Sequence, residues 1–374
     1  MTDKFLDLAV AGIQGLHPYQ PGKPVSELKR ELGLSDIVKL ASNENPLGPG
    51  DAVDAAIAGV LPELARYPDA NGFELKAALA ARHGVAPECI TLGNGSNDVL
   101  VLLAESFLAP GLEAVYSRYA FAVYPLAVQA TGAEHRVAEA LPASHPEQPL
   151  GHDLDAMAAL IGPRTRIVFI ANPNNPTGTW IDAPALQRFL DGLPAHVIAV
   201  VDEAYFEYVD APGYPDSSQW LERYPNLVVT RTFSKAFGLA GLRIGYGLSD
   251  PGLAGVLNRL RQPFNTSLVA QAAALAALGD REHLAHGVAL NRRELARVSA
   301  ACREFGLGVI PSAGNFVLVD MGAPAAPLFE ALLRRGVIVR PVGNYGLPQH
   351  LRISIGTEPE NDRLIAALAE VLKQ

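Results

Sequence analysis

Residues Thr232–Gly247 read TFSKAFGLAGLRIGYG and place Lys235 in a run of small and apolar residues. The only other charge in this stretch is Arg243, eight positions later. A surface lysine ordinarily keeps polar neighbours, because its ammonium group is strongly hydrated. Desolvation lowers the pKa of a lysine, and such lysines act as bases or form Schiff bases. The stretch therefore indicates either a reactive lysine or an ordinary loop residue, and the rest of the sequence must decide.

Composition narrows the class of protein. The chain has 374 residues, of which 49% are hydrophobic and 18% charged, and this length predicts more than one structural unit. The formal net charge is −9 and no basic block stands out, so we expect no nucleic-acid partner. No apolar run approaches the ~20 residues of a membrane helix, and no signal peptide is recognisable. The two cysteines match no metal or redox spacing. We expect a soluble, cytoplasmic protein without a membrane or metal partner.

Short apolar runs alternate with helical patterns between about residues 50 and 260. Near-continuous valine and isoleucine suit strands that are covered on both faces, so this part predicts a mainly parallel α/β sheet. Helical patterns separate the runs at 73–84, 98–108 and 183–193. The candidate strands are 89–92, 113–117, 166–171, 196–202, 226–232 and 243–248.

The pattern changes after Arg261. A long helical stretch at 281–305 precedes GNFVLVD, a helix near 324–335, GVIVRP, LRISIGT and a final helix, which together predict a smaller α+β layer. The first residues are rich in Pro and Gly and are typical of an arm. We predict an arm at 1–45 that contributes to the small domain, a large domain at 46–262 and a small domain at 263–374.

A glycine-rich turn lies in TLGNGSNDVLVLL (91–103), between a strand end and a helix that opens at Ser96 and Asn97. Backbone N–H groups at such a helix start, next to Gly95, are suited to bind a phosphate. The dinucleotide fingerprint is absent, because Asp98 stands where its third glycine would be. A tight turn with a helix-capping side chain would also account for these residues.

Two further strands end in polar side chains. In IANPNNPTGTW (170–180), Asn-Pro steps force extended backbone, so the loop either fixes an amide side chain or merely connects two elements. In VIAVVDEAYFEY (197–208), Asp202 follows a buried strand, and ligands of open α/β sheets bind at that edge. A carboxylate there needs water, a metal or a cationic ligand atom, and no metal-ligand spacing accompanies it. Tyr205 could share the site.

Lys235 directly follows the strand 226–232, so it falls at the same edge of the sheet. The hydroxyl groups of Thr232 and Ser234, together with Arg243, indicate a bound phosphate. One site would then hold a Schiff-base lysine, a carboxylate for a ring cation, a phosphate nest and an arginine. This combination matches pyridoxal 5′-phosphate, which proteins bind through a lysine and a pyridinium–Asp pair.

The motifs NPNNPTG (172–178), VDEAYFEY (201–208) and TFSKAFGLAGLRIGYG occur in the order seen in one large family. They resemble the signature set of the class I/II aminotransferases of the aspartate aminotransferase fold. HPYQPGKP, KLASNENPLGP, RYPD, GNGSND, VIVRP and LRISIGT are similar, more narrowly, to histidinol-phosphate aminotransferases. The resemblance spans nearly the whole chain. It implies a large, seven-stranded type of sheet domain that binds pyridoxal phosphate, a smaller α+β domain, and a homodimer with shared active sites.

The resemblance also implies roles for individual residues around the cofactor. Lys235 would form the Schiff base and shuttle protons, and Asp202 would pair with the pyridine nitrogen. Tyr205 and Asn175 would hydrogen-bond the phenolate oxygen of the ring. Phe121 would stack on the ring, although Tyr119–Ala120 replace the Pro-Thr that usually precedes this aromatic residue. The remaining implied contacts, all toward the phosphate, are Gly95, Ser96, Asn97, Thr232, Ser234, Arg243 and, from the neighbouring subunit, Tyr67.

On the substrate side, the resemblance makes Arg352 the residue that holds the carboxylate of an amino acid. In histidinol-phosphate aminotransferases the same arginine meets the substrate phosphate, assisted here by Arg340 and by Tyr19 of the arm, with Asn45 close by. Arg340 could instead form a surface ion pair, and Tyr19 could instead pack within the arm.

The implied activity is a transaminase of histidine biosynthesis that moves the amino group of histidinol phosphate to 2-oxoglutarate, giving glutamate. An aromatic amino acid aminotransferase acting on phenylalanine or tyrosine is the alternative, because the family's pocket accepts flat rings and its arginine also binds carboxylates. A decarboxylase shares the scaffold. A catalytically inactive binding module would share it too, but the intact set of Lys, Asp, Tyr and Arg residues argues against that interpretation.

Overall fold

The computed structural model describes residues 5–18, 22–34 and 36–373. Its main layer is a seven-stranded sheet made of β2 (Ile90–Gly93), β3 (Glu113–Ser117), β4 (Glu134–Ala138), β5 (Thr165–Ala171), β6 (Ile198–Asp202), β7 (Leu227–Thr232) and β8 (Gly245–Ser249). The spatial order is β2-β8-β7-β6-β5-β3-β4. β8 is antiparallel to β7 and β2, and the other neighbouring pairs are parallel. The predicted mainly parallel α/β fold is therefore confirmed.

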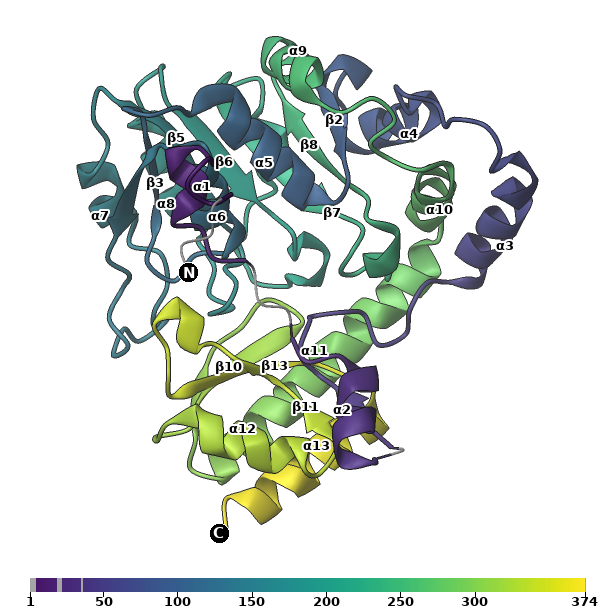
Figure 1. Cartoon of the computed structure of the whole chain (residues 1–374), viewed down its shortest axis with the longest axis vertical. Coiled ribbons are helices and arrows are strands. Elements are labelled where there is room, and N and C mark those ends of the chain that lie inside the picture. The colour runs from purple at the N-terminus through teal and green to yellow at the C-terminus, as the bar shows by residue number, and fades with distance from the viewer. Residues whose placement is uncertain (1–4, 19–21, 35, 374) are drawn as a thin grey trace.

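Helices cover both faces of this sheet (Figure 1). The central strands can be buried on both sides because they are apolar throughout: the runs 167–170 in β5 and 199–201 in β6 have no exposed surface. One face carries α5 (Ser96–Phe107), α6 (Val123–Ala130) and α9 (Pro251–Leu260). The other face carries α3 (Asp51–Val60), α4 (Phe73–His83), α7 (Leu154–Ala159), α8 (Ala183–Asp191) and α10 (Leu268–Gly279).

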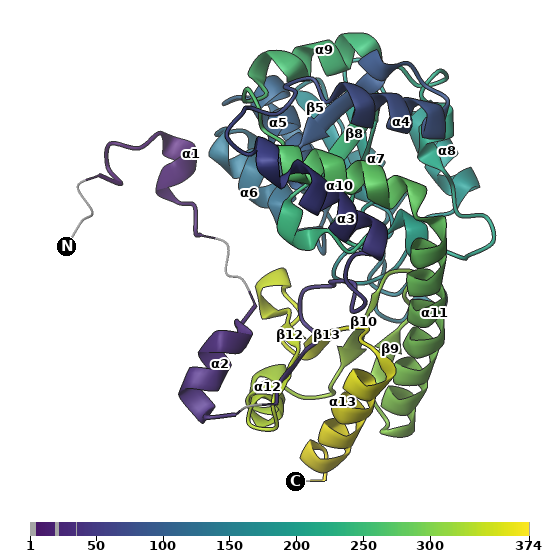
Figure 2. The same cartoon turned by 90° about the vertical axis from the view of Figure 1, so that its right-hand side faces the viewer.

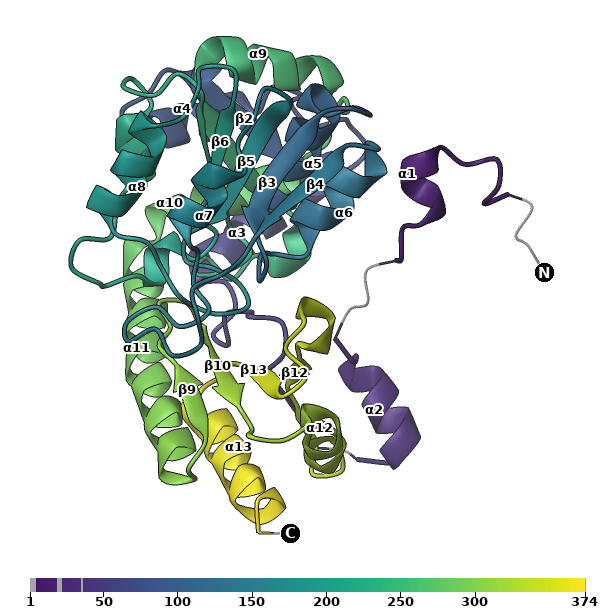
Figure 3. The same ribbon diagram turned by 90° about the vertical axis from the view of Figure 1, so that its left-hand side faces the viewer.

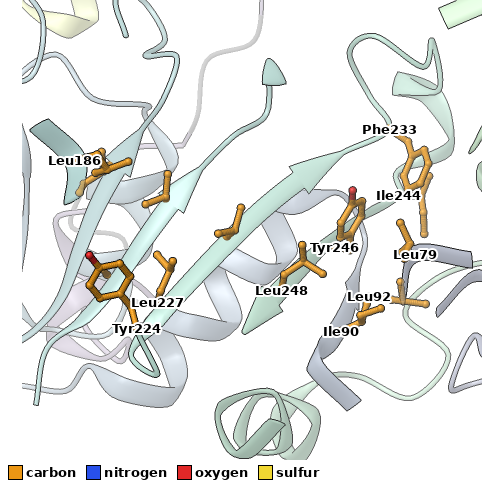
Figure 4. Close-up of a cluster of buried hydrophobic side chains, with 14 of the residues drawn as sticks. Leu79, Ile90, Leu92, Leu186, Tyr224, Leu227, Phe233, Ile244, Tyr246 and Leu248 are labelled. Atoms are coloured by element: carbon orange, nitrogen blue, oxygen red, sulfur yellow. The ribbon is translucent and has the colours of Figure 1, made fainter. Parts of the chain in front are cut away.

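Figure 4 shows part of the apolar core on this second face. Tyr246 and Leu248 from β8 lie near Ile90 and Leu92 from β2 and Leu79 from α4. Burial of these side chains holds β2 beside β8 and contributes the hydrophobic free energy that stabilises this end of the sheet. As a result, the turn that follows β2 lies next to the loop that precedes β8.

One strand of the sheet, β4, was not predicted. Its sequence, EHRVA, is charged and mostly exposed, because β4 is the edge strand and pairs only through β3. The apolar pattern that marks the buried strands is therefore missing from it.

A smaller layer is formed mainly by the C-terminal part of the chain. Its antiparallel sheet has the order β12-β13-β10-β9, made of β9 (Gly308–Ile310), β10 (Phe316–Asp320), β12 (Arg340–Pro341) and β13 (His350–Ser354). β1 (Val38–Lys39), from the N-terminal segment, pairs in parallel with β11 (Val337–Ile338). The helices of this layer are α11 (Arg281–Glu304), α12 (Ala325–Leu333) and α13 (Glu358–Val371).

The long helix α11 runs from the large layer along the side of the small one (Figure 3). α10 lies within the predicted small domain, yet Ala270, Ala273 and Ala274 of this helix belong to the core of the large sheet. In the C-terminal part of the chain, the core of the small layer begins on α11, with Val298 and Cys302. The boundary at 262 stays a prediction.

The N-terminal segment touches both layers. In α2 (Val25–Leu32), Leu28 packs with Leu333 and Ile338 of the small layer, whereas α1 (Ala11–Gln14) contacts α6 of the large one (Figure 2). Gly12 approaches α6 so closely that a Cβ atom there would lie 2.2 Å from the carbonyl oxygen of Gln129. Within the described residues, none of the helices is both long enough and apolar enough to cross a membrane.

A buried ion pair fixes β6 against β7. Arg231 donates to Glu203 Oε2 from Nε (3.0 Å) and Nη2 (2.7 Å), and both side chains are at most 2% exposed. Arg231 Nη2 also lies 2.6 Å from Asp216 Oδ1. A buried charge that loses its partner destabilises the fold strongly.

We predict that Glu203→Gln lowers the free energy of unfolding by about 3 kcal/mol, because it leaves the buried Arg231 guanidinium undercompensated. Urea unfolding followed by circular dichroism measures the change. The control is Glu139→Gln, which breaks an exposed pair with Arg118 and should have no measurable effect. Equal effects of the two substitutions would contradict the assignment.

Candidate active site

Polar side chains meet at the carboxyl edge of the large sheet. Asp202 is the last residue of β6, Thr232 is the last of β7, and Ala171 is the last of β5. Because these strands are parallel, their ends lie side by side. A cavity of about 150 Å³ opens there. It is lined by Ser96, Asn97, Phe121, Ala171, Pro173, Asn175, Asp202, Ala204, Tyr205, Thr232, Ser234, Lys235 and Arg243.

Asp202 is buried at the floor of the cavity, with 4% exposure. The hydroxyl of Tyr124 donates to Oδ2 (2.9 Å), and the hydroxyl of Thr230 donates to Oδ1 (3.0 Å). Burial raises the pKa of Asp202, whereas both hydroxyl donors act to lower it. A carboxylate in this position suits a cationic N–H group of a ligand.

Lys235 lines the same cavity as this carboxylate. Its Nζ donates to the backbone oxygen of Ser42 (3.2 Å) and lies 5.7 Å from the ring centre of Tyr205. Burial, followed by the positive charge of Arg352, lowers the pKa of Lys235 to about 7. The amine is therefore available in its neutral, nucleophilic form near neutral pH. Of the two interpretations of the Thr232–Gly247 stretch, the reactive lysine is the one that this environment favours.

The other end of the cavity forms a cradle for an anion. Gly95 has a left-handed φ of 83° and precedes α5, so the helix presents its first N–H groups to the cavity. A Cβ atom at Gly95 would lie 2.6 Å from Arg243 Nη2 and would force this guanidinium to move, and the positive φ is a further reason for glycine here. Arg243, itself at φ 57°, donates to Ser234 Oγ (3.3 Å). A phosphate fits these donors.

Tyr205 and Asn175 are tied to residues outside the large sheet. Asn43 Nδ2 donates to the Tyr205 hydroxyl (2.9 Å), and burial raises the Tyr205 pKa to about 12. Arg352 donates from Nη1 to Asn175 Oδ1 (2.6 Å) and from Nη2 to the Ala41 carbonyl (2.7 Å). Its Nε is buried without a hydrogen-bond partner among the described residues. Arg352 is thus held at the cavity with donor capacity to spare.

A second arginine stands beside Arg352. Arg340 of β12 is the cross-strand partner of Arg352 in β13. Like charges directly opposite each other repel, so two neighbouring arginines attract an anionic group. The pair is therefore a candidate site for an anionic substrate group.

Two predicted residues, Asn45 and Tyr67, do not line the cavity of their own chain. Asn45 is outside the cavity lining: its Nδ2 donates to the Ala236 carbonyl (2.9 Å) and its Oδ1 accepts from Leu47 N (3.0 Å). Its amide thus fastens the N-terminal loop to the residue after Lys235, and a substrate contact stays a prediction. Tyr67 is 81% exposed and stacks on Phe264 at 4.5 Å, away from the cavity of its own chain. Tyr19 lies outside the described residues.

Sequence reasoning missed Tyr124, Thr230 and Asn43. A signal existed for Thr230, since in a strand it shares a face with Thr232, two positions on. No sequence signal pointed to Tyr124 or Asn43. Tyr124 lies in α6 and Asn43 in the N-terminal loop, and only the fold brings these elements to the end of β6. Among the residues that the structure covers, no group of three or more His, Cys, Asp or Glu side chains could hold a metal.

Comparison with known proteins identifies the family. The model of the family "Aminotransferase class I and II" matches residues 35–368. The chain is a class I/II aminotransferase. Its transaminase activity and its aspartate aminotransferase-like fold, both predicted, are confirmed by this match and by the solved structures it resembles.

Relatives of this aminotransferase carry one recurrent name. The present chain is 57% identical to histidinol-phosphate aminotransferase 2 of Pseudomonas fluorescens Pf-5, over all of its own length and 99% of the relative. It is also 57% identical to histidinol-phosphate aminotransferase 2 of Methylococcus capsulatus, over 98% of each chain.

Solved structures agree with the fold. The histidinol-phosphate aminotransferase of Sinorhizobium meliloti, in complex with pyridoxal 5′-phosphate, superposes with a TM-score of 0.88 at 31% identity over 97% of each chain. The aspartate aminotransferase of Thermus thermophilus with maleate has a TM-score of 0.82 at 23% identity, over 96% of this aminotransferase and 98% of that chain.

We predict that burial of Lys235 makes the cofactor-free protein more stable as the pH rises. The unfolded chain keeps this proton up to its ordinary pKa of 10.5, whereas the folded chain releases it near 7. Between these values the free energy of unfolding should therefore rise by about 1 kcal/mol per pH unit relative to Lys235→Met.

Urea unfolding of the cofactor-free proteins at several pH values measures this difference. Lys29→Met, which replaces an exposed lysine of α2, is the matched control. Parallel stability curves for the wild type and Lys235→Met would contradict the prediction.

Proposed function

We propose that the protein transfers the amino group of histidinol phosphate to 2-oxoglutarate, using pyridoxal phosphate. The observation that carries this proposal is the cavity itself, which is lined by the half-buried amine of Lys235, the buried carboxylate of Asp202 and the residues of the anion cradle. The names of the relatives, at up to 57% identity over the full chain, support the choice of substrate.

The residues of the cavity fit pyridoxal phosphate. Gly95, Ser234 and Arg243 would hold the phosphate, because the Arg243 guanidinium lies against Gly95 and donates to Ser234 Oγ. Asp202 would accept a hydrogen bond from the ring nitrogen, and Phe121 would cover one face of the ring. Thr232, Ser96 and Asn97 complete the proposed cofactor contacts. When bound, this cofactor supplies an electron-accepting ring that stabilises negative charge on the substrate's α-carbon.

The chain's own chemistry is proton transfer and orientation. Lys235 Nζ, neutral near pH 7, would take the proton from the α-carbon of the amino donor and deliver it to the cofactor carbon that receives the amino group, and it would move a proton the opposite way for the amino acceptor. Tyr205 and Asn175 would hydrogen-bond the ring oxygen and set the angle of the ring above Asp202. The amino acceptor then passes through the same steps in reverse.

Arg340 and Arg352 would bind both substrates in turn. Histidinol phosphate carries a phosphate and no carboxylate, whereas 2-oxoglutarate carries two carboxylates. Paired guanidinium groups satisfy either anion through bidentate, charge-assisted hydrogen bonds. We place the imidazole ring of the donor between this pair and the cavity, with Tyr19 and Asn45 as further proposed contacts.

We further propose that the enzyme works in the cytoplasm as a homodimer. Tyr67, Leu64, Phe73 and Phe264 are large apolar side chains that are 41% to 81% exposed, and Tyr67 stacks on Phe264. A second copy would cover these side chains, and its Tyr67 would then reach the cofactor phosphate. In this arrangement the large domain at 46–262 binds the cofactor. The small domain at 263–374 and the arm at 1–45 supply the remaining residues of the substrate site.

Comparison of amino donors tests the proposed function. We predict that kcat/KM for histidinol phosphate exceeds that for phenylalanine and for tyrosine by about 100-fold. The single carboxylate of phenylalanine or tyrosine would satisfy fewer of the hydrogen-bond donors of Arg340 and Arg352 than a phosphate would. Steady-state assays with 2-oxoglutarate as acceptor measure the ratio, and Lys235→Ala should abolish turnover with every donor.

A preference for phenylalanine or tyrosine would instead identify an aromatic amino acid aminotransferase. Release of carbon dioxide from an amino acid would identify a decarboxylase. Either result would contradict the proposed function.

Arg340→Gln tests the phosphate contact. We predict a rise of about tenfold or more in the KM for histidinol phosphate, because a charge-assisted hydrogen bond is lost. The KM for phenylalanine should change far less. Arg334→Gln, which replaces an exposed arginine at the end of α12, is the control. An unchanged KM for histidinol phosphate would mean that Arg340 serves only the surface, and equal rises for both donors would contradict a contact specific to the phosphate.

A further inference from the structure

Tyr124 is fully buried beneath the cavity, and its hydroxyl is bonded to Asp202. A buried hydroxyl is unfavourable unless it finds a partner, and a phenylalanine would fill the same space without that penalty. Asp202 Oδ2, at 2.9 Å, is the partner that the Tyr124 hydroxyl has found. The hydroxyl therefore has a specific place in the site.

The ring of Tyr124 is fixed by aromatic packing on two sides. It stacks on Phe169 of β5, with ring centres 4.8 Å apart and planes at 9°. Phe121 meets its other side edge-on, with centres 5.8 Å apart and planes at 87°. Tyr124 thus connects Phe121, the proposed ring-stacking residue, with Asp202, the proposed partner of the ring nitrogen. Such packing holds the hydroxyl in one direction.

Thr230 donates to the other carboxylate oxygen. Thr230 and Asp202 are register partners on β7 and β6, so the strand pairing sets the 3.0 Å contact between Thr230 Oγ1 and Oδ1. Each oxygen of Asp202 therefore receives one hydroxyl donor. Donors on both oxygens fix the plane of the group and favour the ionised, acceptor-only form. Lys235 and Tyr205 are the other titratable groups that act on Asp202.

We propose that Tyr124 and Thr230 are positioning residues that hold Asp202 ionised and aimed at the cofactor's ring nitrogen, so that the shared proton stays on the ring. This inference rests on the proposed function, because it concerns the same cofactor. It adds two residues that touch Asp202 and do not touch the substrate. Without these donors the carboxylate becomes more basic, and the proton moves from the ring nitrogen to Asp202.

Tyr124→Phe removes the hydroxyl and keeps the ring packing. We expect the dissociation constant of pyridoxal phosphate from the cofactor-free protein to rise about tenfold, since a hydrogen bond to a charged group is lost. The ¹⁵N signal of ring-labelled cofactor should move from the protonated toward the neutral pyridine position. Tyr116→Phe is the matched control, since it removes a buried hydroxyl bonded to His135 (2.7 Å), and both readouts should stay unchanged.

A cofactor analogue with carbon in place of the ring nitrogen separates positioning from general structure. If Tyr124 acts through Asp202 on that nitrogen, Tyr124→Phe weakens pyridoxal phosphate and does not weaken the analogue. Thr230→Val should move both readouts in the same direction, and it serves as the test variant if Tyr124→Phe does not fold.

Three results would overturn the inference. An unchanged ¹⁵N signal in the folded variants would do so, and so would an equal loss of affinity for cofactor and analogue. Wild-type protein that binds no pyridoxal phosphate would overturn the proposed function as well. If the wild type binds the cofactor with a protonated ring nitrogen and the variants give the same ¹⁵N signal, the inference about Tyr124 and Thr230 fails and the proposed function stands.

Discussion

Two ionisable groups, the half-buried Lys235 and the buried Asp202, line one small cavity, and this arrangement organises the rest of the site. Burial penalises the charged form of each group: it lowers the pKa of the lysine to about 7 and raises that of the aspartic acid. An amine in this state can act as a nucleophile and a base. A carboxylate in this state needs a cationic partner, which a protonated ring nitrogen supplies.

The parallel sheet makes this arrangement possible. β5, β6 and β7 all end at one edge, so residues far apart in the sequence meet there without long loops. The buried pair of Arg231 and Glu203 lies directly beside this edge and fixes the two strands that carry Asp202 and Thr230. The small layer then brings Arg352 to Asn175, which ties the arginine proposed to bind the substrate to the cavity.

Much of this could be predicted from the sequence, because the chemistry is concentrated at strand ends. A buried strand followed by Asp202, and another followed by Lys235, predicts a shared edge once the sheet is taken as parallel. The contacts of Tyr124 and Asn43 could not be predicted in this way. Each depends on how a helix or a loop from another part of the chain packs on the sheet. Asn45 illustrates the opposite case, since its motif pointed to the substrate while its amide bonds the backbone beside Lys235. β4 escaped prediction because an exposed edge strand needs no apolar pattern.

The central claim is that pyridoxal phosphate is bound through Lys235, facing Asp202. Reduction of the loaded protein with borohydride, followed by peptide mass mapping, tests it directly, because reduction fixes the cofactor on the amine that holds it. The account predicts one pyridoxyl group per chain, on the peptide that contains Lys235. A label on another lysine, or no label at all, would contradict it.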